Sequence, residues 1–195
     1  GKPMELGSAR RALESGLAMV SEDRRGVGLL LDESIEDNIV FNAMQINGDF
    51  LTAVAGLRFK NGRKIRDHAL RMIKELDIRC TSPLQHTGTL SGGNQQKVCI
   101  ARALTMHPKL LFVSEPTRGI DIGTKAEIQK IVIQLAEEGM ALIFISSEID
   151  EMLRCCNRMA VLRDKVKVAE LSGEEISEAA IMNLIAGGAQ NEQPA

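Results

Sequence analysis

Two continuous apolar runs flank a helical pattern in the second half of the chain, and this arrangement constrains the fold most. The runs span residues 109–113 and 141–145. Between them, the apolar positions from about Gly123 to Glu138 have the spacing of a helix. A uniformly apolar strand, a crossover helix and a second such strand are typical of a parallel sheet with helices on both faces. The sequence therefore predicts an α/β fold.

The rest of the pattern predicts a mainly helical region first and a small hairpin near the end. We expect a helix over 8–15, a buried strand over 17–20 and two helices within 34–76, joined by a loop or weak helix over about 47–62. Ser34 with Asp37 forms the capping box of the first of these helices. Helices are also expected from near Gly92, over 148–153 and over 174–186. A hairpin over 159–162 and 166–169 precedes the last helix, and the polar tail after Gly188 is expected to be disordered.

Charge and aromatic content exclude several classes of binding protein. The 195 residues include 24 basic and 26 acidic side chains, which give a formal net charge of −2. Only 3% are aromatic, with no Trp or Tyr, so stacking on bases or sugars is not supported and we expect no nucleic-acid partner. No run of eighteen apolar residues suits a membrane span. The four cysteines have no C-x-x-C spacing, and we expect reduced, mostly buried thiols.

A serine followed by two glycines at a helix start is a candidate phosphate site. The segment is Leu90-Ser-Gly-Gly-Asn-Gln-Gln-Lys97. Its glycines leave several backbone N–H groups free to point at one anion, and the helix dipole favours negative charge there. Taken alone, the same residues also suit a serine N-cap before a flexible turn. The phosphate interpretation is favoured because Glu115 follows a buried strand, at the sheet edge where parallel sheets bind ligands.

In combination these motifs resemble the nucleotide-binding domain of ABC transporters. The resemblance covers essentially the whole chain and is greatest to the second of the two fused domains in bacterial sugar-import ATPases of the ribose, galactose and xylose type. The segment 90–97 is similar to the family signature, and Pro116-Thr-Arg-Gly-Ile-Asp-Ile-Gly123 to the stretch running into the D-loop. Val20-Ser-Glu-Asp-Arg-Arg25 resembles the family's V-P-E-D-R-[KR], and Ile145-Ser-Ser-Glu148 resembles the segment of the switch histidine.

The resemblance implies one ABC ATPase domain over 1–195 that lacks its P-loop part. Its fold would be a partial P-loop ATPase (RecA-like) core with a parallel sheet, plus a helical signature subdomain. The helical subdomain is expected at about 25–105, further core strands and helices at 106–188, and a disordered tail at 189–195.

The resemblance also implies which residues act on the nucleotide. ATP with Mg²⁺ would be bound between two such domains, and the signature would contact phosphate held by the P-loop of the opposite domain. Glu115 would orient or activate the attacking water. The other implied positions are Ser91, Gly92, Gly93 and Gln95 of the signature, Glu22 at the Q-loop place, where it would couple the site to the membrane subunit, and Asp121 of the D-loop.

The partners implied by the resemblance are those of an importer. They are a second ATPase domain, membrane permease subunits and, indirectly, a periplasmic sugar receptor. The implied location is the cytoplasmic side of the bacterial inner membrane.

Three positions depart from the family pattern. No G-x-x-x-x-G-K-[ST] occurs in these residues. We therefore expect the P-loop upstream of Gly1 and little ATP binding by the chain alone. Ser114 stands where an aspartate helps hold Mg²⁺, and Ser147 stands at the switch-histidine position, so no direct metal ligand is assigned.

Two functions remain open at this point. The favoured one is the ATP-hydrolysing, energy-coupling subunit of a sugar importer; the alternative is a catalytically degenerate domain that only completes a partner's ATP site. A soluble ABC ATPase of translation or DNA repair is disfavoured by the composition. His68, His86 and His107 match no family site and are expected to be surface or structural residues. Arg118 suits a structural role and a nucleotide contact equally well.

Overall fold

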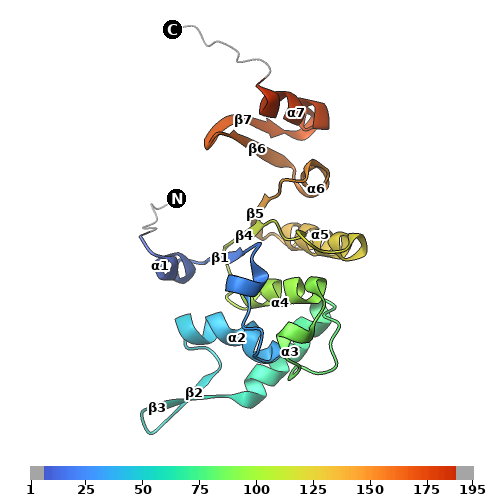
Figure 1. The fold of residues 1–195 in the computed structure, drawn as a ribbon. Helices are drawn as coiled ribbons and strands as arrows, with labels where there is room; N and C mark the ends of the chain where they lie inside the picture. The colour runs from blue at the N-terminus through green and yellow to red at the C-terminus, as the bar shows by residue number, and fades with distance from the viewer. Residues whose placement is uncertain (1–6, 188–195) are drawn as a thin grey trace. The chain divides into compact units, whose positions relative to one another are not determined.

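The computed structural model describes residues 7–187 and divides into two compact units, one ending at Ile143 and one beginning at Phe144 (Figure 1). Within the described residues, no helix combines the length and the apolar character needed to span a bilayer.

The first unit contains, in chain order, the following helices, strands and turns: α1 (Ala9–Glu14), β1 (Leu17–Val20), a short π-helical turn (Arg24–Gly28), α2 (Ile35–Ile46), β2 (Leu51–Val54), β3 (Leu57–Lys60), α3 (Gly62–Glu75), a 3-10 turn (Thr87–Thr89), α4 (Gly92–Leu104), β4 (Leu110–Ser114) and α5 (Ile122–Glu137).

The first unit contains a parallel sheet, as the α/β pattern predicts, and the candidate phosphate site lies beside it. Its strand order is β1-β4-β5, where β5 (Ala141–Ile145) contains the boundary between the units. β1 and β4 are parallel, with Val20 beside Val113, so both strands end at the same edge. On one face the side chains of both strands are buried, but Met19 on the other is 61% exposed. The expectation of cover on both faces is therefore wrong for this part of the sheet, because an apolar strand sequence does not specify what packs on it.

The helical region is built around α2 and α4. α2 begins at the Ser34 cap, whose Oγ accepts a hydrogen bond from the Asp37 backbone N–H at 3.1 Å. The serine half of the predicted capping box is thus confirmed, and the Asp37 carboxylate accepts from Ser34 Oγ at 2.8 Å. Side chains at helical spacing along α2 are completely buried, and so is most of α4; they include Ile35, Ile39, Val40, Ala43, Val98, Ile100 and Ala101. This apolar contact fixes the direction in which the N-terminal end of α4 points.

A buried polar network ties α2 and α4 to the chain that follows β1. Asn38 is fully buried and donates from Nδ2 to the carbonyl of Leu30 and to Oγ1 of Thr87, each at 2.8–2.9 Å. Arg102 of α4 is 8% exposed and donates to the Asn38 backbone carbonyl at 2.8 Å, to Asn38 Oδ1 and to the Gly28 carbonyl at 2.6 Å. Burial lowers the pKa of Arg102 from its usual value.

The segment predicted as a loop or weak helix over 47–62 is an antiparallel hairpin, so that expectation is wrong. Strands β2 and β3 pair with Val54 opposite Leu57. Ala55 and Gly56 make the two-residue turn, both with positive φ, at 51° and 82°. Such turns normally use Asn-Gly or Asp-Gly, and alanine rarely adopts this backbone, so the local signal was weak.

The second unit agrees with the predicted elements except at the start of its last helix. It contains α6 (Ile149–Cys155), then the hairpin of β6 (Arg158–Arg163) and β7 (Val166–Ser172), turning at Asp164 and Lys165 as predicted. The last helix, α7 (Glu178–Ala186), begins later than expected. Ser172 and Glu175 form a capping box on a separate 3-10 turn (Gly173–Glu175), and Ser177 caps α7 itself. The tail predicted after Gly188 lies outside the described residues.

Candidate functional site

The N-terminal tip of α4 presents the candidate phosphate site. Ser91 is the N-cap and is exposed; its Oγ accepts hydrogen bonds from the Asn94 side-chain amide at 2.9 Å and from the Asn94 backbone N–H at 3.5 Å. The first turn contains no acidic residue. A helix N-terminus with glycines in its first turn offers backbone donors and positive potential to an anion. The tip is therefore chemically suited to phosphate, and its cap is accessible.

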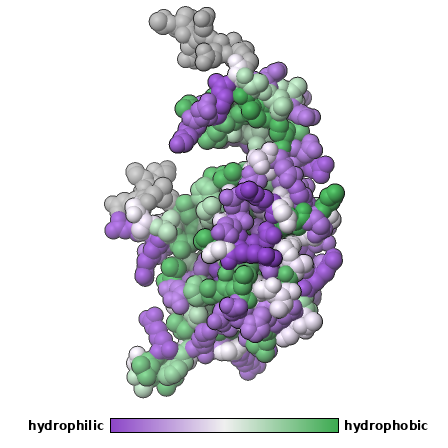
Figure 2. All heavy atoms as spheres, in the orientation of Figure 1, coloured by the Kyte–Doolittle hydropathy of each residue, from purple (hydrophilic) through white to green (hydrophobic). Residues whose placement is uncertain are grey.

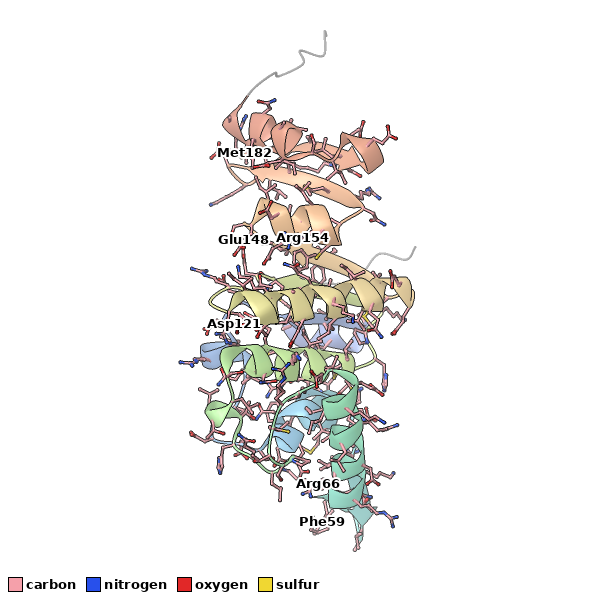
Figure 3. All side chains as sticks on the ribbon, turned by 90° about the vertical axis from the view of Figure 1, so that its right-hand side faces the viewer. Phe59, Arg66, Asp121, Glu148, Arg154 and Met182 are labelled. Atoms are coloured by element: carbon pink, nitrogen blue, oxygen red, sulfur yellow. The ribbon has the colours of Figure 1, made fainter. Side chains whose placement is uncertain are left out.

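Gly93 is required by the contact between α4 and α5. A Cβ built on Gly93 would overlap Cγ2 of Thr124, in the first turn of α5. Thr124 is itself held by the α5 N-cap, Asp121, which accepts from the Thr124 backbone N–H at 3.0 Å and from Oγ1 at 2.8 Å. These hydrogen bonds lower the pKa of Asp121. Asp121, labelled in Figure 3, therefore orders the Thr124 side chain against which Gly93 packs.

A buried lysine makes a second link between the same two helices. Lys97 is 2% exposed, and its Nζ lies 2.9 Å from Oε2 of Glu127 on α5 and donates to the Asp77 carbonyl at 2.8 Å. Arg79 donates to the other oxygen of Glu127 at 3.0 Å. The hydrogen bond from Lys97 lowers the pKa of Glu127. A buried cation without such partners is strongly destabilising, so this arrangement fixes α5 against α4.

The segment after β1 covers the other side of the tip. A Cβ on Gly92 would lie 2.9 Å from a terminal nitrogen of Arg24, and Arg24 also donates to the Arg118 carbonyl at 3.1 Å. Arg118 in turn forms an ion pair with Glu22 at 2.7 Å. Glu22, Arg24 and Arg118, together with Asp23 and Arg25, line an open cavity of about 340 Å³. Glu22, the glycine tip and the segment after β4 are thus brought together at the carboxyl edge of the sheet.

Ser114 and Glu115 end the central strand at that edge. Both side chains are half-buried. Glu115 has φ of 45°, in the left-handed region, which costs a residue with a Cβ roughly 1 kcal/mol or more. The Arg118 backbone N–H donates to the Glu115 carbonyl at 3.2 Å, which closes the turn toward α5. The carboxylate is therefore presented from a tight turn at the place where parallel sheets bind ligands.

Comparison with known proteins assigns the family. The family model described as "ABC transporter" matches residues 1–118, more than half of the chain. The chain belongs to the ABC transporter family. Its curated relatives include the ribose import ATP-binding protein RbsA of Ruegeria sp. (strain TM1040), 38% identical over 190 residues, which are 97% of this chain and 36% of the relative. The fructose import ATP-binding protein FruK of Bifidobacterium longum (strain NCC 2705) is 40% identical over 187 residues, 95% and 35% of the two chains. This chain thus spans little more than a third of these relatives.

Solved structures show the same ABC fold. cbiO1 from Clostridium perfringens, part of the ABC transporter complex cbiONQ, has a TM-score of 0.70 at 22% identity, covering 93% of this chain and 68% of its own. The ATP-binding cassette MJ0796, in a dimeric post-hydrolysis state bound to ADP and Pi, has a TM-score of 0.65 at 22% identity, covering 81% and 63%. At these identities the likeness concerns the fold alone.

Among the signature residues of this ABC domain, Gln95 lies apart from the exposed Ser91 cap. Its side chain is 1% exposed, and Nε2 donates to the carbonyls of Leu90, Thr87 and Gly88 at 3.2–3.4 Å. Gln95 therefore supports the loop before the helix, and the side chain does not reach the surface where a nucleotide would bind. Of the four signature positions, Ser91, Gly92 and Gly93 form the tip.

The switch position and the metal position offer hydroxyl groups. Ser147 is exposed and belongs to the second unit, directly after β5. Among residues 7–187, no group of three or more His, Cys, Asp or Glu side chains is arranged to hold a metal ion. Glu115 is the carboxylate nearest in sequence to Ser114.

The histidines and cysteines have structural surroundings. His68 is 9% exposed, with Nε2 2.9 Å from Oγ1 of Thr105, and burial lowers its pKa. His68 and His107 line a cavity of about 580 Å³, and His86 Nδ1 lies 2.6 Å from the Asp32 carbonyl oxygen. All four cysteines are free thiols, but only Cys99 is fully buried, with its pKa raised to about 12 by burial. The expectation of mostly buried thiols is thus too strong.

Several residues of the site were not singled out from the sequence. Arg24, Lys97 and Thr124 contribute through contacts between segments far apart in the chain. Arg24 lies in the charged run 22–25, and Lys97 ends the signature, so the sequence places both residues within motifs that resemble the family. Nothing in the sequence indicates a role for Thr124, because only the packing of α5 on α4 places it against Gly93.

The glycine tip generates a stability prediction. Gly93→Ala places a methyl group against Thr124 and should lower the free energy of unfolding by about 1–3 kcal/mol, the usual cost of overpacking. Gly62→Ala is the matched control, because a Cβ there has no neighbour within 4 Å. Urea unfolding would measure both. Thr124→Ser removes the obstructing methyl and should restore much of the loss, whereas a Gly93→Ala protein as stable as Gly62→Ala would refute the packing argument.

Proposed function

We propose that this chain is part of the ATP-binding, energy-coupling subunit of an ABC sugar importer. The observation that carries the proposal is the tip of α4, where an accessible Ser91 cap and two glycines are held between Arg24 and Thr124. In this proposal the tip contacts the γ-phosphate of an ATP molecule that is bound to the P-loop of another ATPase domain. The ribose and fructose import relatives support a sugar as the transported substrate.

The residues around the tip have distinct proposed roles. Ser91 Oγ and the first-turn N–H groups of Gly92 and Gly93 donate to phosphate oxygens, and the helix dipole adds to this attraction. Glu115 holds the attacking water from the end of β4. Mg²⁺, when bound with ATP, neutralises phosphate charge. Because the described residues contain no three-ligand cluster, we propose that most of its ligands come from the nucleotide and from the P-loop domain.

The D-loop and Q-loop positions are proposed to connect this phosphate contact to the rest of the importer. Asp121 orders Thr124 against the tip, and Glu22 holds Arg118 beside it. Because Arg24 lies against Gly92, a movement of the segment 21–28 would displace the N-terminal end of α4. We propose that permease subunits at the cytoplasmic side of the bacterial membrane act on this segment, with a periplasmic receptor delivering the sugar from the other side.

The trans contact predicts the effect of Ser91→Arg in the complete importer. The larger side chain fills the phosphate position, so ATPase activity and sugar uptake should each fall at least about tenfold, as when one oxyanion donor is lost. Ser177→Arg is the matched control, because Ser177 is also an exposed N-cap serine, on α7. Either change should cost only about 1 kcal/mol of stability. Unchanged ATPase and uptake in Ser91→Arg would show that the tip does not touch nucleotide.

A second candidate function is a degenerate domain that completes a partner's ATP site and hydrolyses slowly or not at all in its own. Ser114 and Ser147 favour it, because both are neutral where the family pattern has a carboxylate and a histidine. Glu115 opposes complete loss of hydrolysis, since the water-positioning carboxylate is present.

Ser114→Asp distinguishes an impaired metal position from an adequate one. If the missing charge limits Mg²⁺ binding, restoring it should improve affinity or rate about ten- to a hundredfold, equivalent to roughly 1.5–3 kcal/mol. The measurement is ATPase rate against Mg²⁺ concentration in the complete importer. Ser177→Asp adds the same charge at an N-cap that accepts aspartate and serves as control. Identical Mg²⁺ curves for Ser114→Asp and the unaltered protein would show that this position does not limit metal use.

A further inference from the structure

The β2–β3 hairpin has an exposed apolar face that nothing in the described chain covers. Val54 and Leu57 are directly opposite each other, and Phe59 lies two residues further along β3 on the same face. Their exposures are 57%, 64% and 53%. The hairpin projects beyond α2 and α3 in Figure 1, and its end forms an apolar patch in Figure 2. Such contiguous exposed apolar side chains mark an interaction surface.

Basic residues are concentrated on β3 and along α3, which follows it. Seven basic residues and one acidic residue lie between Leu57 and Lys74, in a chain whose overall charge is −2. Lys60 and Arg66 are paired with Asp37 and Glu36 of α2, and Arg63 lies 3.9 Å from Asp67. The remaining four are exposed, and they are Arg58, Lys64, Arg71 and Lys74. The local charge is therefore positive although the protein as a whole is slightly acidic.

The hairpin is anchored at its base, so its apolar face is held in place. Lys60 Nζ is 2.7 Å from Asp37 Oδ1. The Asn61 backbone N–H donates to the Phe50 carbonyl at 2.8 Å, and Asn61 Nδ2 donates to Thr52 Oγ1 at 3.0 Å. Asn61 also caps α3, with its Oδ1 accepting from the Lys64 N–H at 3.1 Å. The tip, by contrast, consists of the small residues Ala55 and Gly56.

We propose that this hairpin docks on the surface of an anionic phospholipid bilayer. The three apolar side chains enter the interfacial region, and the exposed Lys and Arg side chains contact lipid phosphates. A bilayer suits the geometry better than a protein partner does. A stable protein interface buries roughly 800 Å² on each side, more than three side chains on a narrow projecting hairpin supply. A bilayer can take up the few apolar side chains of a narrow hairpin, and the positive charge of the neighbouring Lys and Arg side chains favours anionic lipid headgroups.

The test is sedimentation of the chain with vesicles, without nucleotide. The chain should bind phosphatidylcholine vesicles that contain about one phosphatidylglycerol in three lipids, bind pure phosphatidylcholine vesicles at least about tenfold more weakly, and be released by salt. The double variant Leu57→Ser/Phe59→Ser should lower binding at least about tenfold. Leu162→Ser is the matched control, because Leu162 is 65% exposed on β6. Lys64→Glu should also weaken binding about tenfold, whereas Lys130→Glu on α5 should not.

Three outcomes would overturn the proposal. The first is equal binding to neutral and anionic vesicles. The second is vesicle binding that the hairpin variants leave unchanged while circular dichroism shows them folded. The third is no vesicle binding together with hairpin-dependent self-association or hairpin-dependent binding to purified permease, which would assign the surface to a protein partner. None of these readouts uses ATP, so they are independent of the proposed ATPase function.

Discussion

The buried guanidinium of Arg102 is the contact on which the rest of the site depends. It donates to two carbonyls and one side-chain oxygen, which belong to the end of the π-helical turn at Gly28 and to Asn38 of α2. Removing it would take the donor from the Gly28 carbonyl, and an unsatisfied buried acceptor costs about 1–3 kcal/mol, whereas Asn38 Oδ1 keeps the Leu30 backbone N–H at 2.9 Å. Because Arg102 lies on α4 itself, the same helix that presents Ser91 also holds the segment carrying Arg24. Arg102 therefore links α4, α2 and the π-helical turn directly.

Close packing around the two glycines then shapes the proposed phosphate site. Arg24 lies against Gly92, and Thr124 lies against Gly93, so neither glycine has room for a side chain without a shift of its neighbour. The two glycines allow α5 and the π-helical turn to approach the helix start, and Gly93 is itself buried by that contact. Lys97, which is buried, and Glu127, which is partly exposed, add an ion pair behind the tip. In the proposed function this site binds phosphate through backbone N–H groups, a mode of recognition that does not require aromatic side chains.

The parts that could be predicted from the sequence are those with a local cause. Ser34, Ser91 and the apolar runs predict caps and strands, because a cap hydrogen bond or a buried strand depends on neighbouring residues. The β2–β3 hairpin could not be predicted, since its turn uses an alanine at positive φ. The role of Thr124 and the burial of Gln95 depend on tertiary packing, which cannot be derived from a single sequence. The roles of Glu115, Glu22 and Asp121 toward nucleotide remain predictions from the family resemblance and the geometry.

The most direct test of the central claim asks whether Ser91 lies beside the γ-phosphate. Orthovanadate trapped with Mg-ADP takes the place of that phosphate, and irradiation cleaves the backbone that touches it. In the complete importer, the account predicts a cut at Ser91, identified by mass spectrometry, that requires both vanadate and ATP. Vanadate-trapped protein that is cleaved at other segments and stays intact at Ser91 would contradict it.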